Sequence, residues 1–174
     1  MKIETINYKD IYYPPGGILL WIIIFLELIT FGMALIAMVI YSKDESLIFH
    51  NSRLLLNTTY GIINTIFLIA SGYFMAQSVK NLKESNIKKS SWYLKLTMLG
   101  GLLFLMIKSI EYYDKIEAGL TIGYNTFFTF YWMLTLFHVV HVIVGLVILL
   151  FVQRDLYKNK SNIKLEDFEA SAAF

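Results

Sequence analysis

The sequence predicts an all-α, polytopic membrane protein, built as a bundle of four transmembrane helices. Hydrophobic residues make up 57% of the 174 residues, and four apolar stretches exceed the roughly 18 residues that indicate a membrane-spanning helix. The chain has no cysteine, which excludes disulfide frameworks, thiolate metal sites and thiol catalysis. No stretch resembles a phosphate-binding loop, a dinucleotide fingerprint or a nucleophile with its base, and nothing indicates nucleic-acid binding. We therefore expect a single membrane domain, 1–174, with no catalytic residues.

The boundaries of the elements follow from the apolar runs and the polar segments between them. The apolar runs predict four transmembrane helices, at about 17–41, 54–79, 92–113 and 125–152. A charged tail, 153–174, follows the last of them. The segments between the spans are expected to be loops: 42–53, 80–91 and 114–124. Pro14-Pro15-Gly16-Gly17 ends any helix before the first span. The first span lacks a small-residue cleavage site, so we expect it to remain as an anchor.

Lysine and arginine are distributed unequally between the two sides of the expected bundle. The N-terminal segment, the 80–91 loop and the tail fall on one side and carry ten of these residues, against three in the two opposite loops. Cytoplasmic loops are enriched in Lys and Arg. The N-terminus and the tail are therefore expected to be cytoplasmic.

Small and polar residues recur at helical spacing along the two middle spans. The second span carries Asn57, Gly61, Asn64, Ser71 and Ser78. The third carries Thr97, Gly101, Lys108 and Glu111, with Lys115 just past its end. Such stripes let membrane helices approach closely and form hydrogen bonds with each other. We expect both stripes to face the inside of the bundle.

The fourth span contains two histidines near its middle, His138 and His141, three positions apart on one helix face. Two ligands from one face cannot occupy opposite axial positions of a single haem. A copper or zinc site would need a third ligand, and nothing in the sequence requires Glu27 to supply it. We therefore expect the histidines to form interhelical hydrogen bonds, with no metal site and no cofactor-binding residue in this chain.

Three ionisable residues complete the candidate site. Glu27 lies in the middle of the first span, where a carboxyl group is costly unless it is neutral or hydrogen-bonded. It could be a functional acid, a structural partner of a histidine or of Thr135, or both. Lys108 and Glu111 are three residues apart near the outer end of the third span, so we expect an ion pair with ends that snorkel toward the interface.

Four stretches, taken together, resemble subunit III of the haem-copper oxidases. They are LELITFG at 26–32, LLLNTTYGIINTIFLIASGYFMAQSV at 54–79, LGGLLFLMIKSIEYYDKIEAGL at 99–120 and NTFFTFYWMLTLFHVVHVIVG at 125–145. The last stretch carries the family's FHxxHVxxG pattern on residues 137–145. Lys108 stands where oxidase-type members usually have Gln, so the chain most closely resembles the short NorE-type branch associated with nitric oxide reductase.

The resemblance implies an accessory subunit without a redox centre of its own. It would support the stability, lipid binding and proton uptake of catalytic subunit I, which would hold haem and copper or non-haem iron. It implies the bacterial inner membrane as location, and phospholipids as partners. The family continues from a tail like EDFEASAAF into a fifth helix, whereas this sequence stops at Phe174, so we expect either a truncated sequence or a subunit without that helix. A buried polar seam or lipid cleft would comprise Glu27, Asn57, Lys108, Glu111, His138 and His141.

Two other functions are compatible with a polar seam inside a small bundle. An independent proton or ion transporter could use Glu27, Lys108 and the histidines as a relay, although the spans show neither an internal repeat nor a proline interruption. A transient assembly factor is the other alternative.

Overall fold

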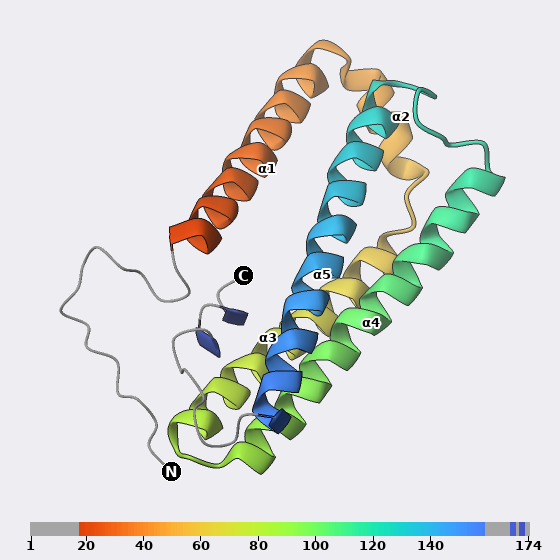
Figure 1. The fold of residues 1–174 in the computed structure, drawn as a ribbon. Helices are drawn as coiled ribbons and strands as arrows, with labels where there is room; N and C mark the ends of the chain where they lie inside the picture. Colours follow the sequence, from red (N-terminus) through yellow and green to blue (C-terminus); the bar gives the residue numbers. More distant parts are fainter. Residues whose placement is uncertain (1–17, 159–167, 170, 173–174) are drawn as a thin grey trace.

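The computed structural model describes residues 18–158, 168–169 and 171–172, and the long elements in this part of the chain are α-helices (Figure 1). The helices are α1 (Ile18–Asp44), α2 (Ser46–Leu54), α3 (Thr58–Lys83), α4 (Ile87–Glu117) and α5 (Thr126–Lys158). Within the described residues, α1, α3, α4 and α5 are long and apolar enough to cross a membrane. The expected all-α, polytopic bundle is therefore confirmed.

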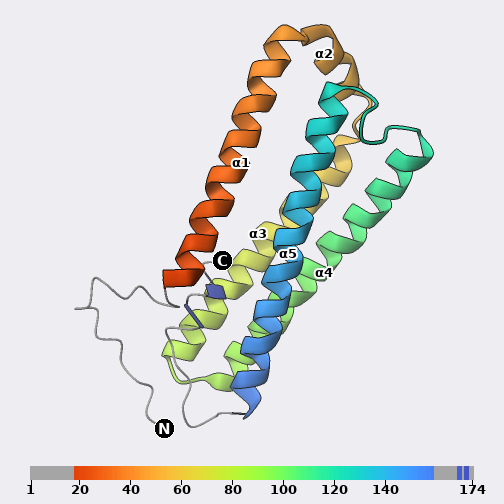
Figure 2. The same ribbon diagram turned by 45° about the horizontal axis from the view of Figure 1, so that its top comes forward.

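The helices are arranged around α5. Figures 1 and 2 show α3 and α4 as an antiparallel pair on one side of α5, and α1 on its other side. α1 packs against α5 and α2, whereas α5 also packs against α4. We call the end of the bundle that contains α2 the α2 end, and the opposite end, where residues 84–86 join α3 to α4, the turn end.

Each of the last three long helices begins at an asparagine whose side chain satisfies a free backbone N–H group. The Oδ1 atom of Asn57 accepts from the N–H of Thr59 at 3.1 Å. At the start of α4, Oδ1 of Asn86 accepts from the N–H of Lys89, and at the start of α5, Oδ1 of Asn125 accepts from the N–H of Phe128 at 2.9 Å. Asparagine is among the preferred helix-capping residues, so these positions fix where the helices start.

α3 and α4 approach each other closely along the predicted stripes of small and polar residues. The Ser71 hydroxyl donates to the backbone oxygen of Thr97 at 2.9 Å, and the Ser78 hydroxyl donates to that of Ser90 at 2.8 Å. A Cβ atom on Gly100 would lie 2.9 Å from the Cβ of Ser71. The inward orientation of Ser71, Ser78 and Thr97, which are buried, is confirmed.

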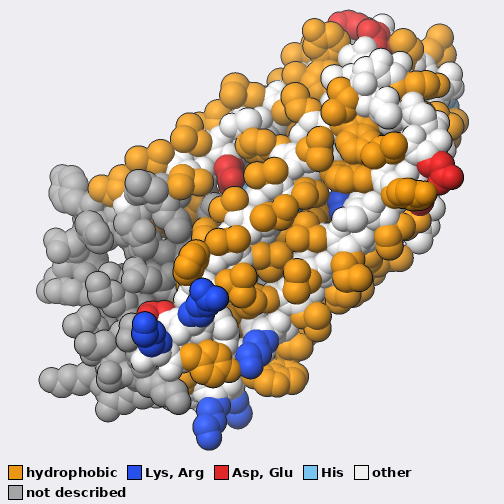
Figure 3. Space-filling view, turned by 45° about the vertical axis from the view of Figure 1, so that its right-hand side comes forward, with side chains coloured by type: hydrophobic (Ala, Val, Ile, Leu, Met, Phe, Trp, Pro, Cys, Tyr) orange, Lys and Arg blue, Asp and Glu red, His pale blue; other side chains and the backbone are white. Residues whose placement is uncertain are grey.

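Buried apolar side chains gather at the two ends of the bundle. The α2 end holds a cluster of Phe49, Leu120, Phe127, Phe128 and Trp132. The turn end holds a cluster of Met75, Leu82, Leu94, Leu156 and Phe168. Polar side chains, described below, occupy the middle between these clusters. Many large apolar side chains elsewhere are exposed, and Figure 3 shows them spread over the long helices, as expected for a surface that faces lipid.

The structure corrects three of the expected loops. Residues 42–53 were expected to be a loop, but most of them belong to the last residues of α1 and to α2. α2 forms because Phe49 and Ser52 share one helix face, which is buried against α5. The expected loop at 80–91 shrinks to residues 84–86, since Asn86 starts α4 early and Ser85 adopts the positive φ of a tight turn. α4 likewise continues to Glu117, inside the third expected loop.

The charged tail is also different from the expectation. α5 continues to Lys158, so the first part of the tail is helical. Phe168 is only 2% exposed and belongs to the cluster at the turn end, and Glu169 forms an ion pair with Lys83 at 2.5 Å. The break expected at 14–17 and the tail residues 159–167 lie outside the described part of the chain.

Candidate functional site

Four polar side chains of α5 lie on one face of the helix. Tyr131, Thr135, His138 and His141 follow one another at steps of four, three and three residues, which is the spacing of a single helical stripe. All four are at least partly buried. This stripe faces the neighbouring helices, and two separate clusters form along it.

The first cluster joins α1 to α5. The Oε2 atom of Glu27 lies 2.5 Å from Nδ1 of His141, and the two side chains are 22% and 25% exposed. Of the two partners expected for Glu27, a histidine is therefore the one observed. Thr135, the other, donates instead to the backbone oxygen of Tyr131 at 2.7 Å. A carboxyl group and an imidazole that share a hydrogen bond reduce each other's cost inside a membrane.

His138 lies beside this pair among aromatic rings. Its ring is stacked on that of His141, with 6.2 Å between ring centroids and an angle of 10°. It also meets the rings of Phe104 and Phe31 edge-on, at 5.4 Å and 6.1 Å. The ring thus packs between α1 and α4 as part of the bundle interior. Within residues 18–158, 168–169 and 171–172, no three His, Cys, Asp or Glu side chains come together as metal ligands.

The second cluster joins α4 to α5 nearer the α2 end. Lys108 Nζ lies 2.9 Å from Oε2 of Glu111, and the Tyr131 hydroxyl donates to the other carboxylate oxygen of Glu111. The Lys108 ammonium group also lies over the rings of Tyr112 and Tyr131, at 5.4 Å and 5.2 Å from their centroids. The expected ion pair is therefore present.

One detail of that expectation was wrong. The Lys108 and Glu111 side chains do not snorkel to the interface, because they are only 12% and 8% exposed. Tyr131 covers them from α5 and supplies the hydroxyl that completes the hydrogen bonding of the carboxylate. The pair lies within α4 and is buried where α4 meets α5.

Two cavities border these clusters. The larger, of about 620 Å³, lies nearer the α2 end between α3, α4 and α5. Its lining includes five polar or charged side chains: Arg53, Asn57, Lys108, Glu111 and Tyr131. The smaller, of about 250 Å³, is lined by His141, Ser71, Thr97 and, from the docked tail, Ser171.

The six candidate residues are therefore divided between two places. Glu27, His138 and His141 form one cluster, and Lys108 and Glu111 form the other. Asn57 lines the cavity of the second cluster, but it is exposed and not buried as expected, because its side chain caps α3. Sequence reasoning had expected a single seam.

Sequence reasoning missed two residues of these sites. Tyr131 is central to the second cluster, yet it resembles any aromatic residue near a membrane interface. Its position seven residues before His138 was the available signal, because that spacing places both on one helix face. Ser171 reaches the smaller cavity from the tail, and no local pattern indicates that contact.

Comparison with known proteins gives these clusters a context. Residues 53–173, which include α3, α4 and α5, match the family described as Cytochrome c oxidase subunit III. Glu27 lies outside the matched residues, whereas Lys108, Glu111 and both histidines lie within them.

Individual relatives agree with the family match. The chain is 34% identical over 113 residues to cytochrome c oxidase subunit 3 of Ornithorhynchus anatinus, an alignment that covers 64% of this chain and 42% of the relative. It is 27% identical over 138 residues to cytochrome bo(3) ubiquinol oxidase subunit 3 of Buchnera aphidicola, covering 79% of this chain and 72% of the relative. The chain thus spans less than half of one relative and most of the other. By these matches, this membrane protein belongs to the subunit III family of the haem-copper oxidases.

Proposed function

We propose that the chain is a non-catalytic accessory subunit of a respiratory haem-copper complex. It would pack against the catalytic subunit, which would hold the haem and the copper or non-haem iron. The family match over residues 53–173 is the observation that carries this proposal. The geometry supports it, because ionisable side chains inside the bundle are paired with one another: Glu27 with His141, and Lys108 with Glu111. The first pair joins α1 to α5, and the Tyr131 hydroxyl joins the second pair, which lies within α4, to α5. Hydrogen bonds between helices hold a membrane bundle together.

Within this role, the partner would be a reductase of the nitric oxide-reducing type. Lys108 supports this branch, because oxidase-type members of the family usually have Gln at that position. The alternative partner is an oxygen-reducing enzyme, which the names of the matched relatives favour. Nitric oxide and oxygen consumption by the purified complex distinguish the two partners.

The larger cavity would hold a phospholipid. Its walls combine apolar side chains such as Ile62 and Ile66 with the charged groups of Arg53, Lys108 and Glu111. This combination suits an amphiphile, since acyl chains can lie on the apolar wall while a headgroup meets the charges. A bound lipid would bridge α3, α4 and α5 and so contribute to the stability of the complex.

The turn end of the bundle would face the cytoplasm of a bacterial cell, with the protein in the inner membrane. Lys80, Lys88, Lys89 and Arg154 lie at this end, and Figure 3 shows basic side chains gathered there. Lysine and arginine are enriched on the cytoplasmic side of membrane proteins. The N-terminal end of α1 points toward this end of the bundle, so the N-terminal segment would be cytoplasmic.

The proposal is tested in membranes of the native host, with the gene for this chain present or removed. An accessory role predicts that removal leaves haem in the membrane and lowers, without abolishing, the turnover of one terminal reductase. Unchanged turnover of all terminal reductases contradicts it. Glu27→Gln separates the accessory role from a transporter. Reductase turnover should be largely retained, and only partly lowered if Glu27 supports proton uptake, whereas a transporter should lose its flux outright.

A further inference from the structure

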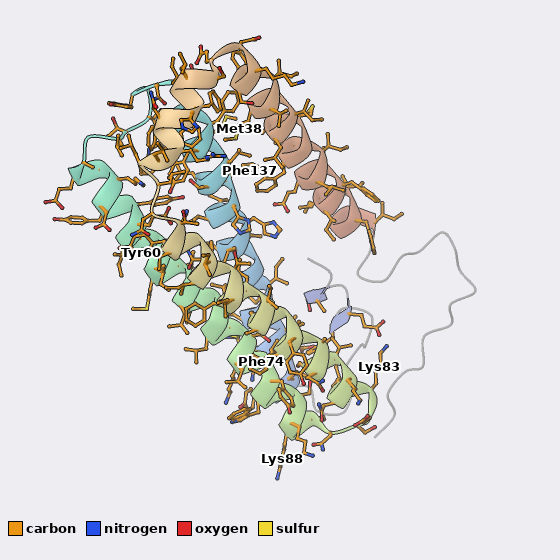
Figure 4. All side chains as sticks on the ribbon, turned by 180° about the vertical axis from the view of Figure 1, so that it is seen from behind. Met38, Tyr60, Phe74, Lys83, Lys88 and Phe137 are labelled. Carbon is orange, nitrogen blue, oxygen red and sulfur yellow. The ribbon has the colours of Figure 1, made fainter. Side chains whose placement is uncertain are left out.

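The described residues of the tail complete the buried interior at the turn end of the bundle. The apolar cluster there takes its side chains from α3, α4, α5 and the tail: Met75, Leu82, Leu94, Leu156 and Phe168. Figures 1 and 4 show the described pieces of the tail beside the turn-end half of α3, and in Figure 4 they lie near the labelled Lys83. The Phe168 ring is only 2% exposed. The tail therefore supplies one side of a core that the three helices do not close by themselves.

The smaller cavity lies next to this cluster, on the side toward the middle of the bundle. Met75 belongs to the cluster and also lines the cavity, while Leu149 and Ala172 pack against the cluster and line the cavity too. Farther from the turn end the lining includes Ser71 and His141. The cavity, of about 250 Å³, has room for several water molecules and polar groups to bind them. The apolar cluster thus separates a partly polar cavity from the turn end.

The contacts of the tail are independent of those that join the long helices. Phe168 inserts its ring into the cluster, and Glu169 forms the ion pair with Lys83, whose side chain is 49% exposed. The Ser171 hydroxyl donates to the backbone oxygen of Phe168 at 2.7 Å, so this hydrogen bond lies within the tail. The hydrogen bonds between α3 and α4 described above do not involve the tail. Short segments docked in this way can open locally while the rest of a protein stays folded.

We propose that the described tail residues, Phe168, Glu169, Ser171 and Ala172, form a lid on the smaller cavity, with the Phe168 ring as its seal. While the ring is in place, the apolar cluster is complete and excludes water from the turn-end side of the cavity. When the ring leaves, water enters past the incomplete cluster and reaches His141 on the cavity wall. The lid thus controls the access of water to a polar side chain in the bundle interior, a role separate from the proposed accessory function.

The lid is tested by the reactivity of single cysteines in the full chain, which has none of its own. Ser71→Cys places a thiol on the wall of the smaller cavity, and Ser52→Cys places one at the α2 end, where the side chain is 3% exposed. The chain is reconstituted in lipid nanodiscs and treated with sulfonatoethyl methanethiosulfonate, a charged thiol reagent. A thiol in apolar surroundings stays protonated and reacts slowly. The first thiol therefore reports on the lid, and the second reports on the fold.

With the tail unaltered, both thiols should react slowly. Phe168→Ala should raise the rate at Ser71→Cys by about tenfold or more, because burial of a phenylalanine ring shifts an opening equilibrium by at least that factor. The rate at Ser52→Cys should stay the same in this variant, since the α2 end does not contain the lid. Leu47→Ala, a matched control at an exposed apolar side chain, should change neither rate.

An unchanged rate at Ser71→Cys in Phe168→Ala, with the thiol at position 52 still protected, overturns the lid. A fast reaction at Ser71→Cys with the tail unaltered also overturns it, because the cavity would then be open to water from another side. If Phe168→Ala exposes both thiols, the bundle itself has opened, and the milder Phe168→Leu decides the question. A faster reaction at position 71 alone in that variant supports the lid, and an unchanged rate there overturns it.

Discussion

Breaking the ion pair between Lys108 and Glu111 should destabilise the bundle strongly. The two side chains are 12% and 8% exposed, and their charged atoms are 2.9 Å apart. Glu111→Leu leaves the Lys108 ammonium group buried without its carboxylate, and Lys108→Met leaves the carboxylate without its cation. Loss of one partner of a buried pair costs about 3–5 kcal/mol, because an uncompensated charge remains. Each single variant should therefore lose about that much stability.

The double variant, with both substitutions, should be more stable than either single one. No uncompensated charge remains in it, and buried ion pairs can be replaced by apolar side chains at little cost. The coupling between the two positions should then be about 3 kcal/mol or more. The measurement is the unfolding free energy of the purified chain in mixed detergent micelles, for the four members of the cycle.

The ion pair between Lys83 and Glu169 serves as the matched control. Its atoms are 2.5 Å apart, but the Lys83 side chain is 49% exposed. Pairs of this kind contribute about 0.2–1 kcal/mol, so Glu169→Gln should have a small effect. Additive effects of the Lys108 and Glu111 substitutions, or a loss no larger than that of the control, would refute the reasoning.

Two further predictions concern packing. Gly100→Ala should lower the unfolding free energy by about 1–3 kcal/mol, because the new methyl group would lie 2.9 Å from the Cβ of Ser71. The control Gly72→Ala, where nothing lies within 4 Å of the new Cβ, should be neutral. Equal unfolding free energies of the two variants in detergent would contradict the close approach of α3 and α4. Phe168→Ala should lower the unfolding free energy by about 3–5 kcal/mol and accelerate proteolysis of the tail, because the ring is only 2% exposed. Leu47→Ala, at a side chain that is 78% exposed, should change neither quantity.

The sequence was sufficient to predict the long helices and not their ends. Four apolar runs require four spanning helices, because backbone polar groups cannot be left unpaired in lipid. α3, α4 and α5 continue beyond the apolar runs to Lys83, Glu117 and Lys158. These last turns have a polar, interface-facing composition, for which hydropathy gives no helical signal. α2 was missed for the same reason, since its only apolar anchor in the bundle is Phe49.

The candidate site was predictable where it depends on local spacing. Lys108 and Glu111 are three residues apart on one helix, so their pairing follows from helical geometry. The partner of Glu27 depends on the relative depth of α1 and α5, and the sequence left a histidine and Thr135 as alternatives. Tyr131 covers the ion pair from α5, and no rule of spacing connects residues on different helices.

The central claim, an accessory role beside a haem-containing subunit, is tested most directly by purifying the tagged chain from its native membrane in a mild detergent. A reduced-minus-oxidised spectrum is then recorded on the eluted material. The account predicts a large co-eluting membrane subunit with haem signals, and nitric oxide or oxygen consumption by the eluate identifies the reductase. Elution of this 20.2 kDa chain alone, without haem absorbance, would contradict a stable accessory subunit.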